Sequence, residues 1–323
     1  MQSSMRAIDN LSSVNSAKLK NKAANSRSPV CMLILACAVV FCFSSVGVCA
    51  KGFEEHVAPI KIAVIGHIYG TYAWNSKDPQ GNRFHGSPLE KFVKEVNENN
   101  YDYVVVTGDI VRGKNIKNFD VIDQFISALD VKEVFFTPGN HDLEYEMLIE
   151  NYSKRIGYLN KNFVLPDANI TLSMINSSGV PEQSLSLDPT GFSLDKDAIK
   201  VITQLDSKLF NIVFMHHHLF WDHMKFSGHE PHRKLSVENM ISWEKDMLPK
   251  LIHQNVKMVI SGDPTCCSNG TFGKINDVAM SFLKNGILHV NASTTWGLDE
   301  IHYLELQVGE NEQALFHKVL SLD

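Results

Sequence analysis

Cysteine is scarce in most of this chain. The part after residue 50 contains just the adjacent pair Cys266 and Cys267, and the other four of the six cysteines lie earlier. A disulfide between neighbouring cysteines is strained, and one pair cannot form a disulfide framework. Two free thiols, buried as small apolar side chains, are therefore favoured over a metal-binding pair.

An excess of positive charge is also lacking. The net charge is -6 and the pI is near 6.2, so the chain has no basic footprint for nucleic acid, and no nucleic-acid partner is expected. With 44% hydrophobic and 20% charged residues, the composition is ordinary for a globular protein. Repeats, low-complexity tracts and long linkers are absent after residue 51, so residues 51–323 are predicted to form one domain.

One long apolar run lies near the start of the chain. It extends from Val30 to Phe43 after a polar, basic leader, and Val48-Cys49-Ala50 is an acceptable signal-peptidase site because its end residues are small. Continued to Ala50, the run has 21 residues, enough to span a bilayer. Residues 1–50 are therefore predicted to be a signal peptide or an uncleaved membrane anchor. Either way the domain is expected to be exported, periplasmic or extracellular.

Short strands alternate with helices along the rest of the chain. Runs rich in Val, Ile and Phe predict buried strands at Ile60–Ile65, Tyr103–Thr107, Glu133–Thr137, Phe210–Met215 and Val256–Ile260. Ser87, Pro88 and Glu90 form a capping-box pattern that predicts a helix from Pro88 to about Asn97. Helical spacing of apolar residues from Phe119 to Leu129 predicts a second helix, and Leu143–Arg155 a third.

The later segments are less regular. Residues 162–191 are rich in Asn, Ser and Pro and are expected to form an insertion with short strands. Three further strands, predicted to close a second and partly antiparallel sheet, are Ile287–Val290, Ile301–Val308 and Ala314–Val319. The predicted class is therefore α/β with layered sheets.

Polar residues follow the carboxyl ends of several predicted strands. Open α/β sheets place ligand sites at this edge, because the loops converge there. Oxygen and imidazole donors suit Zn, Mn or Fe. We therefore expect the following side chains to meet in one place: Asp109, Asn140, His141, His217 and Asp263.

These motifs resemble those of the calcineurin-like metallophosphoesterase superfamily. Gly108-Asp109, then Gly139-Asn140-His141-Asp142, then a histidine after an apolar strand occur in the family's order and spacing. The resemblance implies a layered β-sandwich flanked by helices. It also implies one or two divalent or trivalent ions, Mn, Zn or Fe, and a phosphate-ester substrate attacked by metal-activated hydroxide.

The resemblance also implies roles for matching residues. Asp109 would bridge two metals, and Asn140 and His217 would bind the second. His141, oriented by Asp142, would contact the phosphate and assist the leaving oxygen.

The choice within the run His216-His217-His218 follows the family's His-x-Pro habit, although Leu219 stands at the proline position. His217 is the predicted ligand for this reason, and His216 is the alternative.

The chain departs from the family pattern at two motifs. His67 and Tyr69 stand where the family has Asp and His, and Asp263 and Thr265 replace the two histidines of Gly-His-x-His. Imidazole, phenolate and carboxylate can all bind metal, whereas the Thr265 hydroxyl is a weak ligand. His67, Tyr69 and Asp263 are therefore predicted to complete the metal site.

The same departures leave two hypotheses for function. The first is an exported metal-dependent phosphoesterase acting on a phosphate mono- or diester. The alternative is an inactive member of the fold that acts as a binding or assembly protein in the cell envelope, because fold does not fix function.

Overall fold

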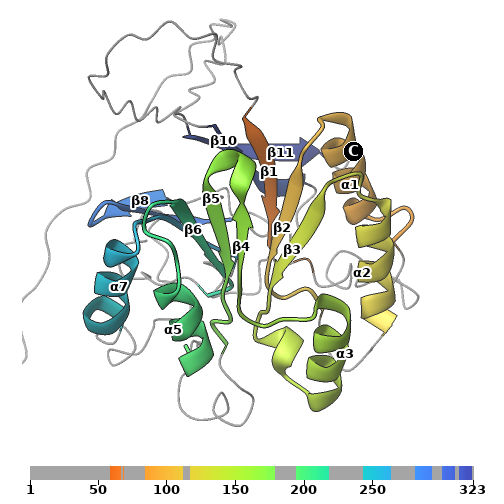
Figure 1. The fold of residues 1–323 in the computed structure, drawn as a ribbon. Coiled ribbons are helices and arrows are strands. Elements are labelled where there is room, and N and C mark those ends of the chain that lie inside the picture. Colours follow the sequence, from red (N-terminus) through yellow and green to blue (C-terminus); the bar gives the residue numbers. More distant parts are fainter. Residues whose placement is uncertain are drawn as a thin grey trace, which may run out of the picture. The chain divides into compact units, whose positions relative to one another are not determined.

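The structure is a computed structural model, and it describes residues 59–66, 68, 84–111, 117–178, 194–217, 243–262, 281–292, 300–309 and 313–321. Two sheets form its centre (Figure 1). The first sheet has the order β11-β10-β1-β2-β3, and its strands are β1 (Ile60–Ile65), β2 (Tyr103–Thr107), β3 (Glu133–Thr137), β10 (Glu300–Val308) and β11 (Gln313–Ser321).

The second sheet has six strands in the order β4-β5-β6-β7-β9-β8. They are β4 (Lys161–Leu165), β5 (Ile170–Met174), β6 (Phe210–Met215), β7 (Val256–Ser261), β8 (Ser281–Lys284) and β9 (Ile287–Asn291). The four inner strands run parallel, and the edge strands β4 and β8 are antiparallel to their neighbours. The segment predicted to be irregular thus supplies β4 and the fully buried β5.

Helices flank the sheets. They are α1 (Pro88–Glu98), α2 (Lys117–Ala128), α3 (Glu146–Ile156), α5 (Lys196–Thr203) and α7 (Leu248–His253). Two 3₁₀ turns, His141–Leu143 and Pro166–Ala168, and a π-helical segment, Trp243–Met247, complete the described elements. No helix among these residues is long and apolar enough to cross a membrane, and the apolar run before residue 51 lies outside the described ranges.

The capping box at the start of α1 is confirmed. The Ser87 side chain accepts a hydrogen bond from the backbone of Glu90, and the Glu90 carboxylate accepts one from Gly86 at 2.6 Å. The third helix differs from its prediction, because His141–Leu143 forms a separate 3₁₀ turn before α3 begins at Glu146.

One sequence prediction is wrong: β10 and β11 do not belong to the second sheet. β10 pairs antiparallel with β1, and β11 pairs with β10. Alternate residues of β10 face two different cores. Leu304 and Leu306 lie between the sheets, whereas Ile301 and Tyr303 lie under the helices. A period-two pattern indicates buried faces but does not name the strand's partner.

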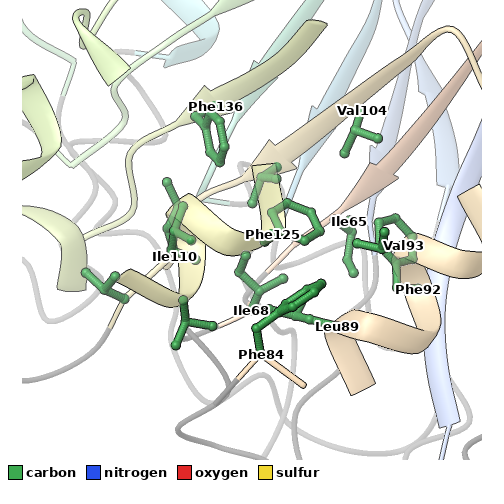
Figure 2. Packing of buried hydrophobic residues seen from close by; sticks show 14 of the residues in the cluster. Ile65, Ile68, Phe84, Leu89, Phe92, Val93, Val104, Ile110, Phe125 and Phe136 are labelled. Atoms are coloured by element: carbon green, nitrogen blue, oxygen red, sulfur yellow. The ribbon is translucent and has the colours of Figure 1, made fainter. Parts of the chain in front are cut away.

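Three apolar clusters hold the layers together. Between the sheets, Val64 and Phe135 of the first pack with Leu172, Phe214 and Ile260 of the second. A second cluster lies under α1 and α2, where Figure 2 shows Phe92, Phe125 and their neighbours. The third packs α5 and α7 on the second sheet. Two sheets thus pack face to face between layers of helices, which confirms the predicted fold class.

The two sheets approach each other closely at the carboxyl ends of their strands. A Cβ atom on Gly262, just after β7, would overlap the carbonyl and side-chain oxygens of Thr107 at the end of β2. Similarly, a Cβ on Gly66 would lie 2.6 Å from Thr107 Oγ1. Glycine at these positions therefore lets strand ends from both sheets converge, which brings the predicted motifs together.

Candidate metal centre

Asp109 is the hub of the candidate centre. It follows β2 with a backbone φ of 50°, directly after Gly108 with a φ of 80°. A left-handed conformation is unfavourable for residues other than glycine and is concentrated at functional sites. The residue is 1% exposed, so its carboxylate is turned into the protein.

The turn after β3 wraps around this carboxylate. The backbone N–H of His141 donates to Asp109 Oδ1 at 3.1 Å. A Cβ on Gly139 would overlap the same oxygen, so glycine is required there. The Oδ1 atom of Asn140, between them, is buried and has no hydrogen-bond partner in the described part of the chain. A buried carbonyl oxygen without a partner is costly unless a cation or other donor satisfies it.

His216 approaches Asp109 from the other sheet. Its Nδ1 lies 3.1 Å from the carbonyl oxygen of Thr107, and its Nε2 lies 3.4 Å from Asp109 Oδ1. A carbonyl oxygen can only accept, so Nδ1 carries the proton. A neutral ring would then direct the Nε2 lone pair toward a carboxylate oxygen, an arrangement that a second proton or a cation between the two atoms would stabilise.

His217, which follows β6, is held by a residue that follows β5 of the same sheet. Its Nδ1 is 2.9 Å from Ser177 Oγ, and its backbone N–H donates to the same oxygen at 3.0 Å. Both residues are buried, and the His217 ring meets the His216 ring edge to face at a centroid distance of 4.9 Å. His217 is therefore close to the centre, while the histidine next to Asp109 is His216.

Asp142 joins two backbone segments at the centre, and its predicted role in orienting His141 stays a prediction. Its carboxylate accepts hydrogen bonds from the backbone N–H groups of Gly139 at 2.7 Å and Val111 at 2.9 Å. Burial, and next the charge of Asp109, raise the pKa of this carboxyl. Asp142 thus fastens the turn after β3 to the segment after β2.

The ring of His141 pairs with Glu144. His141 Nδ1 lies 3.2 Å from Glu144 Oε2, across one turn of the chain. The His141 side chain is 23% exposed, in contrast to the buried Asp109. The backbone of His141 therefore contacts the buried carboxylate, while its side chain is partly exposed.

The predicted site residues divide into two sets. Asp109, Asn140, His141, Asp142 and His217 lie in the described ranges, and the structure gathers them around the ends of β2, β3 and β6. The other predicted ligands, which lie outside the described residues, are His67, Tyr69 and Asp263. Within the described ranges, no three His, Cys, Asp or Glu side chains group as a metal site.

Sequence reasoning missed three partners of the centre. Thr107 offers a backbone carbonyl, which no side-chain pattern reveals. Ser177 is one serine in a polar segment and has no diagnostic spacing. Glu144 stands three residues after His141, a spacing that brings side chains together in a helical turn and could have indicated it.

One cavity in the described part lies away from this centre. Its volume is about 340 Å³, and it is lined by the ends of α2 and α3 and the start of β3, including Lys132, Glu133, Arg155 and Tyr158. Arg155 is committed to ion pairs with Asp120 and Asp123. None of the predicted site residues lines it.

Comparison with known proteins agrees with these observations. The sequence profile described as calcineurin-like phosphoesterase matches residues 60–263, and the chain belongs to this family. No match was found among curated proteins.

Two solved structures illustrate the likeness. One is a dimetal phosphatase from Danio rerio, with a TM-score of 0.52, 13% identity, and coverage of 83% of this chain and 100% of that chain. The other is a purple acid phosphatase from yellow lupin (Lupinus luteus) seeds, with a TM-score of 0.48, 14% identity, and coverage of 81% and 51%. At 13% identity, the first likeness shows the fold alone.

Proposed function

We propose that this chain is an exported, metal-dependent phosphoesterase that hydrolyses a phosphate mono- or diester. The observation that carries the proposal is the convergence on Asp109 of the turn after β3 and of His216 from the other sheet. Family membership supports the class of reaction.

The donors at this point suit a metal ion. A carboxylate from Asp109, an imidazole from His216 and an amide oxygen from Asn140 match the preferences of Mn, Zn or Fe. The contact of His216 Nδ1 with Thr107 fixes the ring and directs Nε2 toward Asp109, as is usual for metal-binding histidines. His67, Tyr69 and Asp263 remain predicted as further ligands.

An ion bound here would act as a Lewis acid on the phosphate oxygens and would activate water. The protein's own residues would position the substrate. His141 is half-buried at the rim, and its Nδ1 faces Glu144. Its Nε2 is then the ring nitrogen that can hold or deliver a proton at the leaving oxygen of the ester.

Turnover of two chromogenic esters tests this proposal. The purified full-length chain is incubated with p-nitrophenyl phosphate or bis(p-nitrophenyl) phosphate and Mn²⁺, Zn²⁺ or Fe²⁺. We expect hydrolysis that falls at least about 100-fold in Asp109→Asn or His216→Gln, in line with the loss of a metal ligand. The control Asp197→Asn changes an exposed carboxylate on α5 and should keep full activity.

Absence of turnover with every metal and both esters would overturn the catalytic proposal and favour the binding or assembly protein. Faster hydrolysis of one of the two esters would indicate whether the natural substrate is a monoester or a diester.

Export is proposed from the leader, with its apolar run and the small residues before Lys51. Cell fractionation with a tag at the carboxyl end tests it. A cytoplasmic product of full mass would contradict export, whereas an exported product of full mass would indicate an uncleaved anchor.

A further inference from the structure

Two neighbouring histidines at the centre are held by different kinds of hydrogen-bond partner. We propose that they carry opposite tautomers, and that His217, fixed by Ser177, is an N–H donor to an anionic oxygen of the substrate. The substrate part rests on the proposed phosphoesterase function. The tautomers themselves follow from the local hydrogen bonds.

The partner of His216 fixes its proton at Nδ1. That atom lies 3.1 Å from the Thr107 carbonyl oxygen, which has lone pairs and no proton to give. The remaining nitrogen, Nε2, points at Asp109 Oδ1 from 3.4 Å. This is the form in which a neutral imidazole binds a metal ion through Nε2.

The partner of His217 leads to the opposite tautomer. Ser177 Oγ accepts from the His217 backbone N–H at 3.0 Å and lies 2.9 Å from His217 Nδ1. If Nδ1 carried the proton, the serine oxygen would accept twice, and its own hydrogen would need another acceptor. In the described part of the chain, both hydrogen bonds of Ser177 Oγ go to His217.

A serine that donates to Nδ1 satisfies its own hydroxyl, the His217 backbone N–H and His217 Nδ1 together. The backbone N–H donates to Oγ, and the hydroxyl hydrogen is given to the ring. Serine and histidine thus close a reciprocal pair that is buried on both sides, since Ser177 is 0% and His217 1% exposed. An unsatisfied hydroxyl in such a place would be destabilising. The His217 proton is consequently at Nε2.

The tautomer decides what His217 can do. A nitrogen that carries a proton cannot bind a metal, but it can donate to a phosphate oxygen. The His217 ring centroid is 4.9 Å from that of His216, so the donor ring lies next to the ring of the proposed metal ligand. The centre around Asp109 would then offer the His216 imidazole to the ion and the His217 imidazole to the substrate. Ser177 is the positioning residue for the second.

Imidazole NMR of the full chain tests the tautomers without metal or turnover. Long-range ¹H–¹⁵N correlations report which ring nitrogen carries the proton. We expect His217 to be protonated at Nε2 in the wild type and in Ser177→Thr, which keeps the hydroxyl. In Ser177→Ala, a mixture of both tautomers is expected.

The matched control is Ser173→Ala. Ser173 is equally buried on β5, and its hydroxyl donates to Asn162 Oδ1 at 2.7 Å, so a buried serine hydrogen bond is lost without touching His217. The His217 tautomer should be unchanged in this variant. Protonation of wild-type His217 at Nδ1, or an unaltered tautomer in Ser177→Ala, would overturn the assignment.

Calorimetry then separates the two histidines. With Mn²⁺ as the metal and inorganic phosphate as the anion, His217→Ala should weaken phosphate binding about tenfold and leave the Mn²⁺ affinity within about twofold. His217→Gln, whose amide can donate, should recover part of the phosphate affinity. His216→Gln should weaken Mn²⁺ binding itself.

The two proposals fail in different ways. If His217→Ala removes Mn²⁺ binding, His217 is a ligand and the inference is wrong while the phosphoesterase proposal stands. If the wild type binds no Mn²⁺, the proposed function fails in its metal requirement, and the NMR result still decides the tautomer of His217.

Discussion

Gly108 directly precedes Asp109 and lies where His216 of the other sheet approaches most closely. Its φ is 80°, and a Cβ atom at this position would lie 2.5 Å from His216 Nδ1. Glycine is therefore required at position 108 both for its left-handed backbone conformation and for its lack of a side chain. The strand end from one sheet and the histidine from the other meet across a single glycine.

Gly108→Ala should damage the centre as well as the backbone. Gly86 is a matched control, because its φ is 79° and nothing lies within 4 Å of an added Cβ. Gly86→Ala should lower the free energy of unfolding by about 1–2 kcal/mol from the left-handed conformation alone. Gly108→Ala should lower it by about 1–3 kcal/mol more, since the ring must shift. Urea unfolding measures both, and equal losses would show that His216 is not closely packed there.

The sequence indicates the residue types of the centre better than their contacts. Asp109 and Asn140 stand in motifs that follow strands, and their position in the fold is confirmed. The choice between His216 and His217 depends on which sheet each ring reaches. Because His216 and His217 are adjacent in the sequence, the sequence does not indicate toward which sheet each ring points. Ser177 and the carbonyl of Thr107 enter the centre through folding alone.

At the scale of elements, α1 shows how a local signal determines structure. Ser87 and Glu90 satisfy the backbone at the start of the helix, and Leu89, Phe92, Val93 and Val96 bury one face. The predicted start at Pro88 is confirmed because capping is a property of neighbouring residues. Pairing of β10 with β1 joins residues more than 200 positions apart, so no local pattern predicts it.

Ser87→Ala should lower the free energy of unfolding by about 1 kcal/mol, because the cap of α1 is lost. Ser127→Ala is the control. That serine is exposed on α2 and its hydroxyl donates to the Asp123 carbonyl within the helix, so its loss should change stability by less than about 0.5 kcal/mol. Indistinguishable urea midpoints for the two variants would argue against the capping role.

The strand pair β10 and β11 is expected to be sensitive to acid. His302 Nδ1 and His317 Nε2 are 3.1 Å apart with ring centroids 5.3 Å apart, so the rings lie end to end and share one proton. Burial, and next the neighbouring His302, lower the pKa of His317 to about 4. The β1 residues on this face are apolar, Ile60, Ile62 and Val64.

The direction of the pH effect follows from this lowered pKa. The folded state disfavours the charged ring, whereas the unfolded chain takes up the proton below about pH 6.5. The stabilisation is complete above about pH 6.5 and is lost as the pH falls toward 4. We expect the urea midpoint to fall less between pH 7 and pH 4.5 in His317→Gln than in the wild type. His253→Gln, at an exposed site on α7, should behave like the wild type.

At the scale of the whole molecule, the packing of the two sheets brings the site residues together. Their apolar faces pack together through the central cluster, and their strand ends meet at Thr107 and Gly262. The layered class was predictable, because runs of buried strands alternating with helices have few ways to cover both faces of each sheet. The assignment of each strand to a sheet was not predictable from the sequence, because it depends on long-range packing.

The most direct test of the metal centre is to count and titrate the metal. The full chain is dialysed free of metal and titrated with Mn²⁺ by calorimetry, beside Asp109→Asn and the exposed control Asp197→Asn. We expect at least one bound ion in the wild type and the control, with an affinity at least about tenfold lower in Asp109→Asn. Equal affinity in Asp109→Asn, or no binding to the wild type, would contradict it.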